Sequence, residues 1–374
     1  MKTPVSYSGF FGSYSGMAEA ARNIVASLNA VGVDVTTQFI PNIQGTMNLG
    51  VLLDIVKSLQ ARQLDYKVKI MHVTPDLITQ HLEPMKYHIF HLFWETDALP
   101  KWWVWALNLC DEVWTGDQYH AEAFRKSGVK KPIFVFPQPI EENADKPPFS
   151  YLNKINRNSL YMFYSIFQWI ERKDPKTLIK AYLREFENEK DVILLFKTYK
   201  ETFSSQEIDD IMSQVVIFKR ELQQKHYPRL GFIQYPMNKH DVLRFHVTGD
   251  CFVLPHRGEG WARTVQEAAL FGKPIISTKL GGVHEYLPDD SAYLLNYEEV
   301  NVFNMDWVPW YSKEQKWAQV DQGELQKKMR HAFENRHEAR SVGAKAAQLI
   351  LRDMNYQAVG NLMKRRLEEI YQNL

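Results

Sequence analysis

The feature that most restricts the fold is a regular alternation of short apolar runs with helix-length amphipathic segments. It runs through the first 136 residues and returns after residue 160. Strands separated by helices form βαβ units around a mainly parallel sheet. The sequence therefore predicts an α/β fold in two similar halves. In the first half we expect strands at 5–7, 33–39, 67–72, 87–94, 112–115 and 132–136.

Chain length and a polar stretch between the halves indicate two domains. A chain of 374 residues is longer than one hydrophobic core usually serves. Residues 137–139 read Pro-Gln-Pro, and the polar segment 141–150 that follows resembles a linker. Ligands of such folds bind beyond the carboxyl ends of the strands, so we expect the site there, in the cleft between the halves.

Composition excludes several classes of protein. A formal net charge of +1 argues against a general binder of polyanions. Cys110 and Cys251 are expected to be reduced core residues. Residues 1–12 lack the pattern of a secretory signal, and no apolar run approaches the ~20 residues of a membrane span. We expect a cytoplasmic protein, with peripheral membrane contact and oligomeric state left open.

Five tryptophans occur close together in the first half. Most are expected to pack in the core or at a domain interface. A stacking platform for a sugar ring or a base remains open for one or two of them. They are Trp94, Trp102, Trp103, Trp105 and Trp114.

The densest chemical signal is the segment 256–267, which follows a predicted strand at 251–254 and enters a helix. A strand end, a glycine turn and a helix N-terminus together form an anion site, because free backbone N–H groups point outward there. Gly258 and Gly260 allow close approach of a ligand, and Glu259 and Glu267 could accept hydroxyl donors. A capped helix with two solvent-facing glutamates fits this segment equally well.

Several motifs, in order along the chain, resemble the retaining glycosyltransferases of the family-4 type, which have the GT-B fold. Glu259 and Glu267 have the spacing of that family's E-x7-E signature. The run EAALFGKPIIST (267–278) is similar to its "EAMAxGxPVIxT". Further similar pieces are the glycine loop 8–16, WETDALP (94–100), RKDP (172–175) and GGVHE (281–285).

This resemblance implies a fold, a domain layout and a reaction. The fold is α/β GT-B, two Rossmann-like domains facing each other across a deep cleft. Residues 1–145 would form the acceptor-side domain and 155–352 the nucleotide-sugar-binding domain. Residues 353–374 would form a helix that crosses back to the first domain.

The resemblance also implies roles for the residues of the second half. Glu267 would hold the donor ribose hydroxyls. Glu259 would contact the transferred sugar, with the amides of Gly260 and Trp261 near it. Ala262, the next residue of this loop, would also contribute to binding the donor.

Cations and first-half glycines are implied to serve the donor phosphates. Lys173, helped by Arg172, would neutralise the diphosphate as the glycosidic bond breaks. Gly12 to Gly16 would supply backbone amides to the phosphates or to the acceptor when the cleft closes.

The chain departs from the family pattern at three positions near this site. Gln168 stands where an arginine is usual, and Ala262 stands where a glycine is usual. Arg263 is additional, and it would either contact phosphate or face solvent.

Two more residues have open roles. Lys197, at the end of a predicted strand, would either reach the donor or extend its ammonium to solvent. Glu95 would be an acceptor-side acid or base or a sugar ligand, or else a strand-end carboxylate paired with Lys101.

We therefore expect a retaining hexosyltransferase that moves a sugar from a UDP- or GDP-sugar to the hydroxyl of a glycan or another acceptor, in glycan or polysaccharide synthesis. No cofactor and no catalytic metal are expected, because no tight Asp-x-Asp pair is found near a strand end. A non-catalytic sugar- or partner-binding module of the same fold stays open. So does a transferase acting on modified DNA bases, although the near-neutral charge gives nucleic acid little support.

Overall fold

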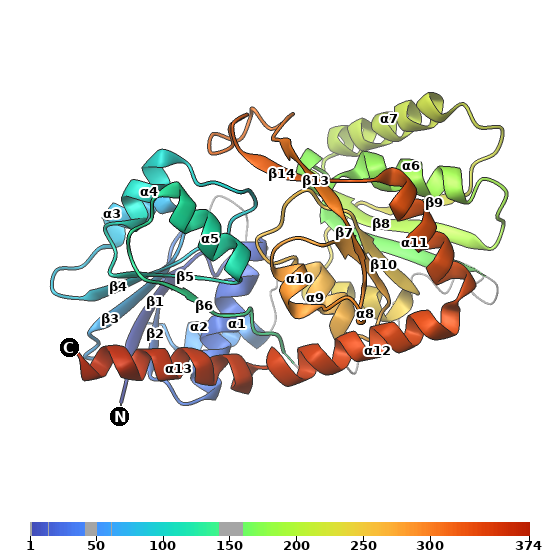
Figure 1. Cartoon of the computed structure of the whole chain (residues 1–374). Coiled ribbons are helices and arrows are strands. Elements are labelled where there is room, and N and C mark those ends of the chain that lie inside the picture. Colours follow the sequence, from blue (N-terminus) through green and yellow to red (C-terminus); the bar gives the residue numbers. More distant parts are fainter. Residues whose placement is uncertain (1, 14, 42–50, 61, 142–159) are drawn as a thin grey trace. The chain divides into compact units, whose positions relative to one another are not determined.

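The computed structural model describes residues 2–13, 15–41, 51–60, 62–141 and 160–374. It divides into two units, residues 1–143 with 351–374, and residues 144–350 (Figure 1). The predicted linker lies outside the described residues from position 142 onward, as do the predicted domain ends 145 and 155. Each unit is described by itself below.

The first unit is built on a six-stranded sheet in the order β2-β1-β3-β4-β5-β6, with every neighbouring pair parallel. Its central strands β1 and β3 are buried along their whole length, as parallel strands covered on both faces are. The strands are β1 (Val5–Gly9), β2 (Val35–Phe39), β3 (Val68–His72), β4 (Tyr87–His91), β5 (Glu112–Thr115) and β6 (Ile133–Val135).

Helices cover both faces of this sheet, and the last helix of the chain belongs to them. Helix α13 (Tyr356–Gln372) packs along α1 (Gly16–Ala30). Gly360 allows this close approach, because a Cβ there would lie 2.6 Å from the backbone oxygen of Ser27. The other helices are α2 (Val51–Ser58), η1 (Pro75–Leu77), α3 (Ile78–His81), α4 (Lys101–Leu107) and α5 (Gln118–Ser127).

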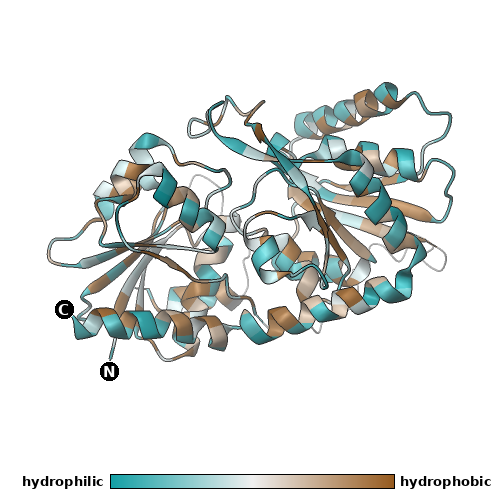
Figure 2. Ribbon diagram, in the orientation of Figure 1, coloured by the Kyte–Doolittle hydropathy of each residue, from teal (hydrophilic) through white to brown (hydrophobic). Residues whose placement is uncertain are grey.

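The second unit has a parallel sheet of the same size in the order β12-β11-β10-β7-β8-β9. Figure 2 shows its strands largely hydrophobic and the outer surfaces of its helices largely hydrophilic. The strands are β7 (Tyr161–Gln168), β8 (Val192–Tyr199), β9 (Arg229–Ile233), β10 (Cys251–Leu254), β11 (Ile275–Thr278) and β12 (Tyr293–Leu295).

The helices of the second unit lie between and after these strands. Helix α6 packs against both α7 and α11, whereas α8 contacts α9. The helices are η3 (Glu171–Lys173), α6 (Pro175–Glu185), α7 (Ser205–Leu222), α8 (Lys239–Thr248), α9 (Arg263–Leu270), α10 (Gly282–Tyr286), α11 (Gln322–Glu334) and α12 (Arg336–Asp353).

The structure differs from the predicted elements at several places. An antiparallel hairpin, β13 (Tyr297–Asn301) with β14 (Lys316–Val320), was not predicted, because β13 is polar and largely exposed. Strand β4 ends at His91, three residues before the predicted end, and β2 begins at Val35, two residues after the predicted start. Helix α9 begins at Arg263, and Ala262 before it has a left-handed backbone.

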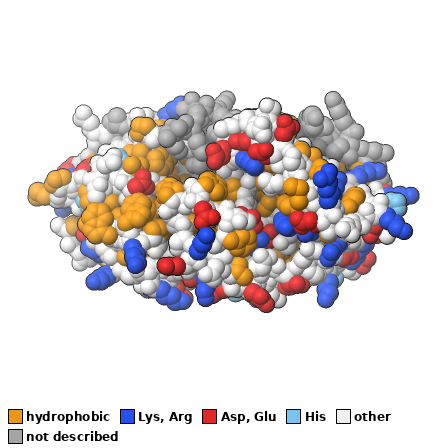
Figure 3. Space-filling model, turned by 90° about the horizontal axis from the view of Figure 1, so that it is seen from above, with side chains coloured by type: hydrophobic (Ala, Val, Ile, Leu, Met, Phe, Trp, Pro, Cys, Tyr) orange, Lys and Arg blue, Asp and Glu red, His pale blue; other side chains and the backbone are white. Residues whose placement is uncertain are grey.

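The tryptophan cluster is mainly core. Trp94, Trp103 and Trp114 are buried, whereas Trp102 and Trp105 on α4 are exposed. In Figure 3, exposed hydrophobic side chains are densest on the surface of the first unit, at the left of the view. Within the described residues, no helix combines the length and the hydropathy of a membrane span.

Two buried histidines end neighbouring strands of the first sheet. The rings of His72 and His91 stack with their centroids 4.8 Å apart, and the hydroxyl of Tyr7 lies 2.8 Å from His72 Nδ1. Neither ring nitrogen of His91 has a hydrogen-bond partner among the described residues. Burial lowers the pKa of His72 to about 3, and burial together with His72 lowers the pKa of His91 well below its usual value.

These histidines predict acid sensitivity of the fold. Below pH 6.5 these two histidines bind protons in the unfolded chain but stay neutral in the folded chain. The free energy of unfolding therefore falls as the pH falls. For His72 alone the loss reaches about 2 kcal/mol by pH 5. Chemical denaturation between pH 8 and 5 measures it, with His91→Phe expected to reduce the slope. An unchanged slope in that variant would contradict the assignment.

Candidate functional site

Two loops of the second unit meet at the carboxyl edge of its sheet. Strand β10 pairs in parallel with β7, with Cys251 opposite Phe163, so the segments that follow both strands leave the sheet side by side. The backbone N–H of Arg257 donates to the carbonyl oxygen of Arg172 at 2.8 Å. This bond holds η3, after β7, against the glycine loop after β10.

Glu259 is the centre of charge where these loops touch. Its carboxylate forms an ion pair with Lys173 and lies 3.6 Å from Arg172 NH1, which also donates to the carbonyl oxygen of Gly258 at 2.7 Å. Burial alone would raise the pKa of Glu259, but Lys173, Arg172 and His256 lower it to about 2. The carboxylate is therefore ionised at neutral pH, and it can accept hydrogen bonds but not donate one.

Glu267 lies on α9 and has its own set of cations. It forms an ion pair with Lys239, and His246 Nε2 and Arg263 NH2 lie 3.4 and 3.9 Å from its oxygens. Burial raises the pKa of Glu267, but Lys239, His246 and Arg263 outweigh it and lower the pKa to about 2.

The solvent-facing alternatives for this segment are wrong. The side chains of Glu259, Glu267 and Arg263 are 11%, 4% and 11% exposed. All three instead belong to buried ion pairs.

The turn into α9 is held in an unusual conformation. Ala262 has φ 60° and ψ 57°, a left-handed backbone that costs a residue other than glycine about 1–2 kcal/mol. The hydroxyl of Tyr286 donates to the carbonyls of Trp261 and Ala262, and Trp261 Nε1 donates to Gln266. These bonds keep the turn in place, with the first N–H groups of α9 directed away from its own helix.

Lys197 lies on β8, the strand beside β7, opposite Ile166. It does not end the strand as predicted, because β8 continues for two more residues to Tyr199. The residue is only 6% exposed, and its ammonium lies 4.5 Å from the ring centroid of Phe203 and 5.7 Å from that of Tyr199. Burial lowers its pKa to about 8. The alternative in which Lys197 extends its ammonium to solvent is therefore wrong.

Sequence reasoning missed the residues that support this site. Lys239 and His246 on α8 were not singled out, because nothing local links them to Glu267, 28 and 21 positions further on. Arg257 was also missed, and its NH2 lies 2.9 Å from Asp174 Oδ1 and 3.3 Å from Glu171 Oε1. Only Asp174 had a local signal, since an aspartate before Pro175 is typical of a helix start.

Gln168, in the place of the usual arginine, has a structural use. Its side-chain Nε2 donates to the carbonyl oxygen of Lys200 at 2.6 Å. It ties the ends of β7 and β8 together, so Arg172 and Lys173 are the cations that the loop after β7 places beside Glu259.

The remaining predicted site residues belong to the first unit. Gly12 lies in the loop after β1, and Gly16 begins α1 behind its N-cap Ser15. Arg22 holds this loop by donating to the carbonyls of Phe11 and Ser13 at 2.6 and 2.7 Å. The half-buried Glu95 follows β4 at the same edge of that sheet.

Neither cysteine forms a disulfide; both are free and buried, as expected. Within the residues that the structure describes, no group of three or more His, Cys, Asp or Glu side chains could hold a metal ion.

A known protein family matches the segment that contains this site. Residues 170–303, which contain both glutamates and both cations, match the model of the family described as glycosyl transferases group 1. The resemblance expected from the motifs is thus confirmed over the segment that carries the site. No curated protein sequence matches the chain.

Solved structures match the chain over nearly its whole length. HepE of Anabaena, in complex with UDP and glucose, is 12% identical with a TM-score of 0.70, covering 98% of this chain and all of that one. Sucrose-phosphate synthase of Thermosynechococcus elongatus is 12% identical at 0.70, covering all of both chains. The trehalose-6-phosphate synthase OtsA is 13% identical at 0.68, covering 98% of this chain and 99% of that one. The predicted α/β GT-B fold class is confirmed.

Proposed function

We propose that this protein is a retaining hexosyltransferase that uses a nucleotide-diphosphate sugar and needs no metal. The observation that carries the proposal is the pairing of Lys173 and Arg172 with Glu259, beside Glu267, inside the segment that matches group 1 glycosyl transferases. Cations and ionised carboxylates at one strand edge suit a ligand that has both phosphates and hydroxyls.

The ion pairs suggest how the donor enters. A donor diphosphate would compete for Lys173 and Arg172, and Glu259 would then be free to accept hydroxyl groups of the transferred sugar. Glu267, held ionised by Lys239, would accept the ribose hydroxyls. Lys197 would add a third positive charge from the neighbouring strand β8.

The chemistry would depend on charge stabilisation. When the bond between the sugar carbon and the phosphate oxygen breaks, negative charge develops on the nucleoside diphosphate, and the two cations would stabilise it. The acceptor hydroxyl would attack from the same face and pass its proton to the departing phosphate oxygen. Glu259 cannot supply a proton, because its pKa is about 2.

Nucleotide release from a panel of UDP- and GDP-sugars, with and without EDTA, tests this proposal. UDP-glucose is the first donor to try, since a HepE structure holds it. We expect one donor to be cleaved, no effect of EDTA, and loss of cleavage in Glu267→Gln.

Glu334→Gln, which alters an exposed ion pair of the same unit, is the control and should behave like the wild type. If no donor is cleaved and no nucleotide raises the melting temperature, the transferase proposal fails. A binding module without catalysis would then be the better interpretation.

A further inference from the structure

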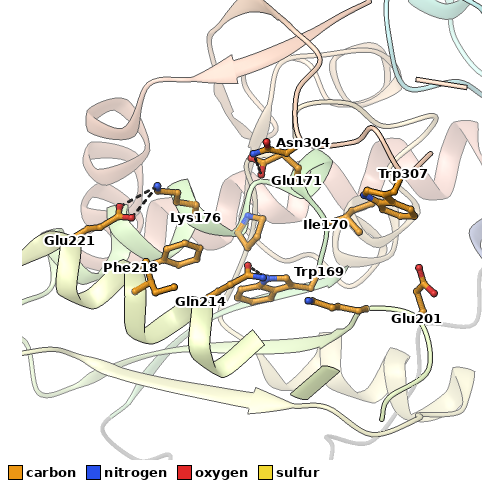
Figure 4. A pocket seen from close by; sticks show the side chains of 13 residues that line it. Trp169, Ile170, Glu171, Lys176, Glu201, Gln214, Phe218, Glu221, Asn304 and Trp307 are labelled. Carbon is orange, nitrogen blue, oxygen red and sulfur yellow. Dashed lines mark hydrogen bonds and ion pairs between the residues drawn. The ribbon is translucent and has the colours of Figure 1, made fainter. Parts of the chain in front are cut away.

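A pocket of about 560 Å³ lies in the second unit, outside the ion pairs described above (Figure 4). It is bounded by the end of β7, the start of α6, one side of α7 and the segment before β14. Aromatic rings contribute much of its wall, namely Trp169, Phe218 and Trp307. Its volume falls within the usual range of small-ligand sites.

The pocket and Lys197 lie on opposite faces of the sheet. Successive side chains of a strand point to opposite faces, and Phe196 directly precedes Lys197. The ring of Trp169, at the pocket, packs near Phe196 with their centroids 6.0 Å apart. Neither Glu259 nor Glu267 lines the pocket. A ligand here would therefore not occupy the donor position proposed above.

The surface available for stacking is at the rim of the pocket. Trp169 is buried and its Nε1 donates to Gln214 Oε1 at 2.9 Å, so it belongs to the fixed wall and presents no open ring face. Trp307 is 58% exposed at the rim. Exposed apolar surface that borders a pocket is typical of a ligand site.

The charges of the lining favour a neutral, hydroxyl-rich ligand. Lys176 is paired with Glu221 at 3.2 Å and Lys200 with Asp210 at 3.4 Å, so neither ammonium is available to bind a phosphate without breaking a pair. Ionised carboxylates, among them Glu201, only accept hydrogen bonds, and sugar hydroxyls donate them.

We infer that this pocket is a second carbohydrate site, which binds a short stretch of a neutral glycan against Trp307. The flat apolar face of a sugar ring would stack on the exposed indole of Trp307, and hydroxyl groups at the ring edges would donate to carboxylates of the lining. Glu171 belongs both to this wall and to the segment that carries Arg172 and Lys173. A bound glycan would thus lie next to the loop that we propose to hold the donor.

Direct binding to the full-length protein tests the inference. Maltohexaose, cellohexaose and mannohexaose are titrated by calorimetry in the presence of saturating UDP, which keeps the donor position occupied. At least one of the three should bind, and Trp307→Ala should weaken that binding about tenfold. The matched control is Trp105→Ala, since Trp105 is 59% exposed, belongs to the first unit and does not line the pocket. The affinity of this variant should equal that of the wild type.

A second variant tests the polar part of the site. Glu201→Gln, at an exposed position, should weaken the same glycan about threefold without changing the melting temperature. The inference is overturned if no neutral hexaose binds, if Trp307→Ala binds as well as the wild type, or if a sulfated hexaose binds more tightly than every neutral one. None of these readouts needs donor cleavage, so failure here is distinct from failure of the proposed transferase activity.

Discussion

Replacing Lys173 by methionine is expected to slow donor cleavage by a factor of about 100 to 1000, the effect of losing one group that stabilises developing negative charge. The same change removes a cation from the buried carboxylate of Glu259 and should lower stability by about 2 kcal/mol. Activity is measured as nucleotide release, and stability by chemical denaturation.

A double variant separates these two effects. Adding Glu259→Gln to Lys173→Met removes the unpaired charge and should recover most of the lost stability, but none of the lost activity. Lys180→Met is the matched control, because Lys180 is similarly sheltered and forms an ion pair with Glu221 on the same unit. If the double variant regains wild-type turnover, the Lys173–Glu259 pair is only structural.

Replacing Lys197 by methionine is expected to stabilise the fold while it weakens donor binding about tenfold or more. Burial lowers the pKa of this lysine from 10.5 to about 8. At neutral pH the folded chain therefore carries a buried ammonium at a cost of about 3 kcal/mol. Binding of the anionic donor that we propose would offset this cost.

The sign of the pH dependence follows from that shift. Between pH 8 and 10.5 the unfolded chain keeps a proton on Lys197 that the folded chain has lost, so the stability of the wild type should rise with pH in this window. Lys197→Met should lack this rise. Lys219→Met is the control, since Lys219 also lies over a ring, 5.4 Å from the centroid of Tyr227, but is only half-buried. A Lys197→Met variant that is less stable than the wild type at pH 7 would contradict the assignment.

Local patterns in the sequence were enough for the strands of the two parallel sheets and for the helices that alternate with them. The buried strands β7 and β8 are apolar runs bounded by helix starts, and the helix start at Asp174-Pro175 follows from capping preferences alone. The hairpin β13–β14 escaped prediction, because a polar, exposed strand has no apolar periodicity to reveal it.

Local sequence patterns did not predict the backbone conformation of the glycine loop. The sequence located the turn before α9, yet it did not reveal that Ala262 would adopt a left-handed backbone. That conformation is maintained by Tyr286, whose hydroxyl reaches the turn from 24 or 25 residues away.

By itself the sequence determined the α/β class, the order of the elements, and the spacing of Glu259 and Glu267, because each depends on neighbours within a few turns of chain. Only the tertiary structure decided how these glutamates are charged and paired. Lys173 reaches Glu259 across 86 positions, and Lys239 reaches Glu267 across 28. Such pairs exist only because parallel strands bring distant loops to one edge of a sheet, where burial strengthens the attraction between opposite charges.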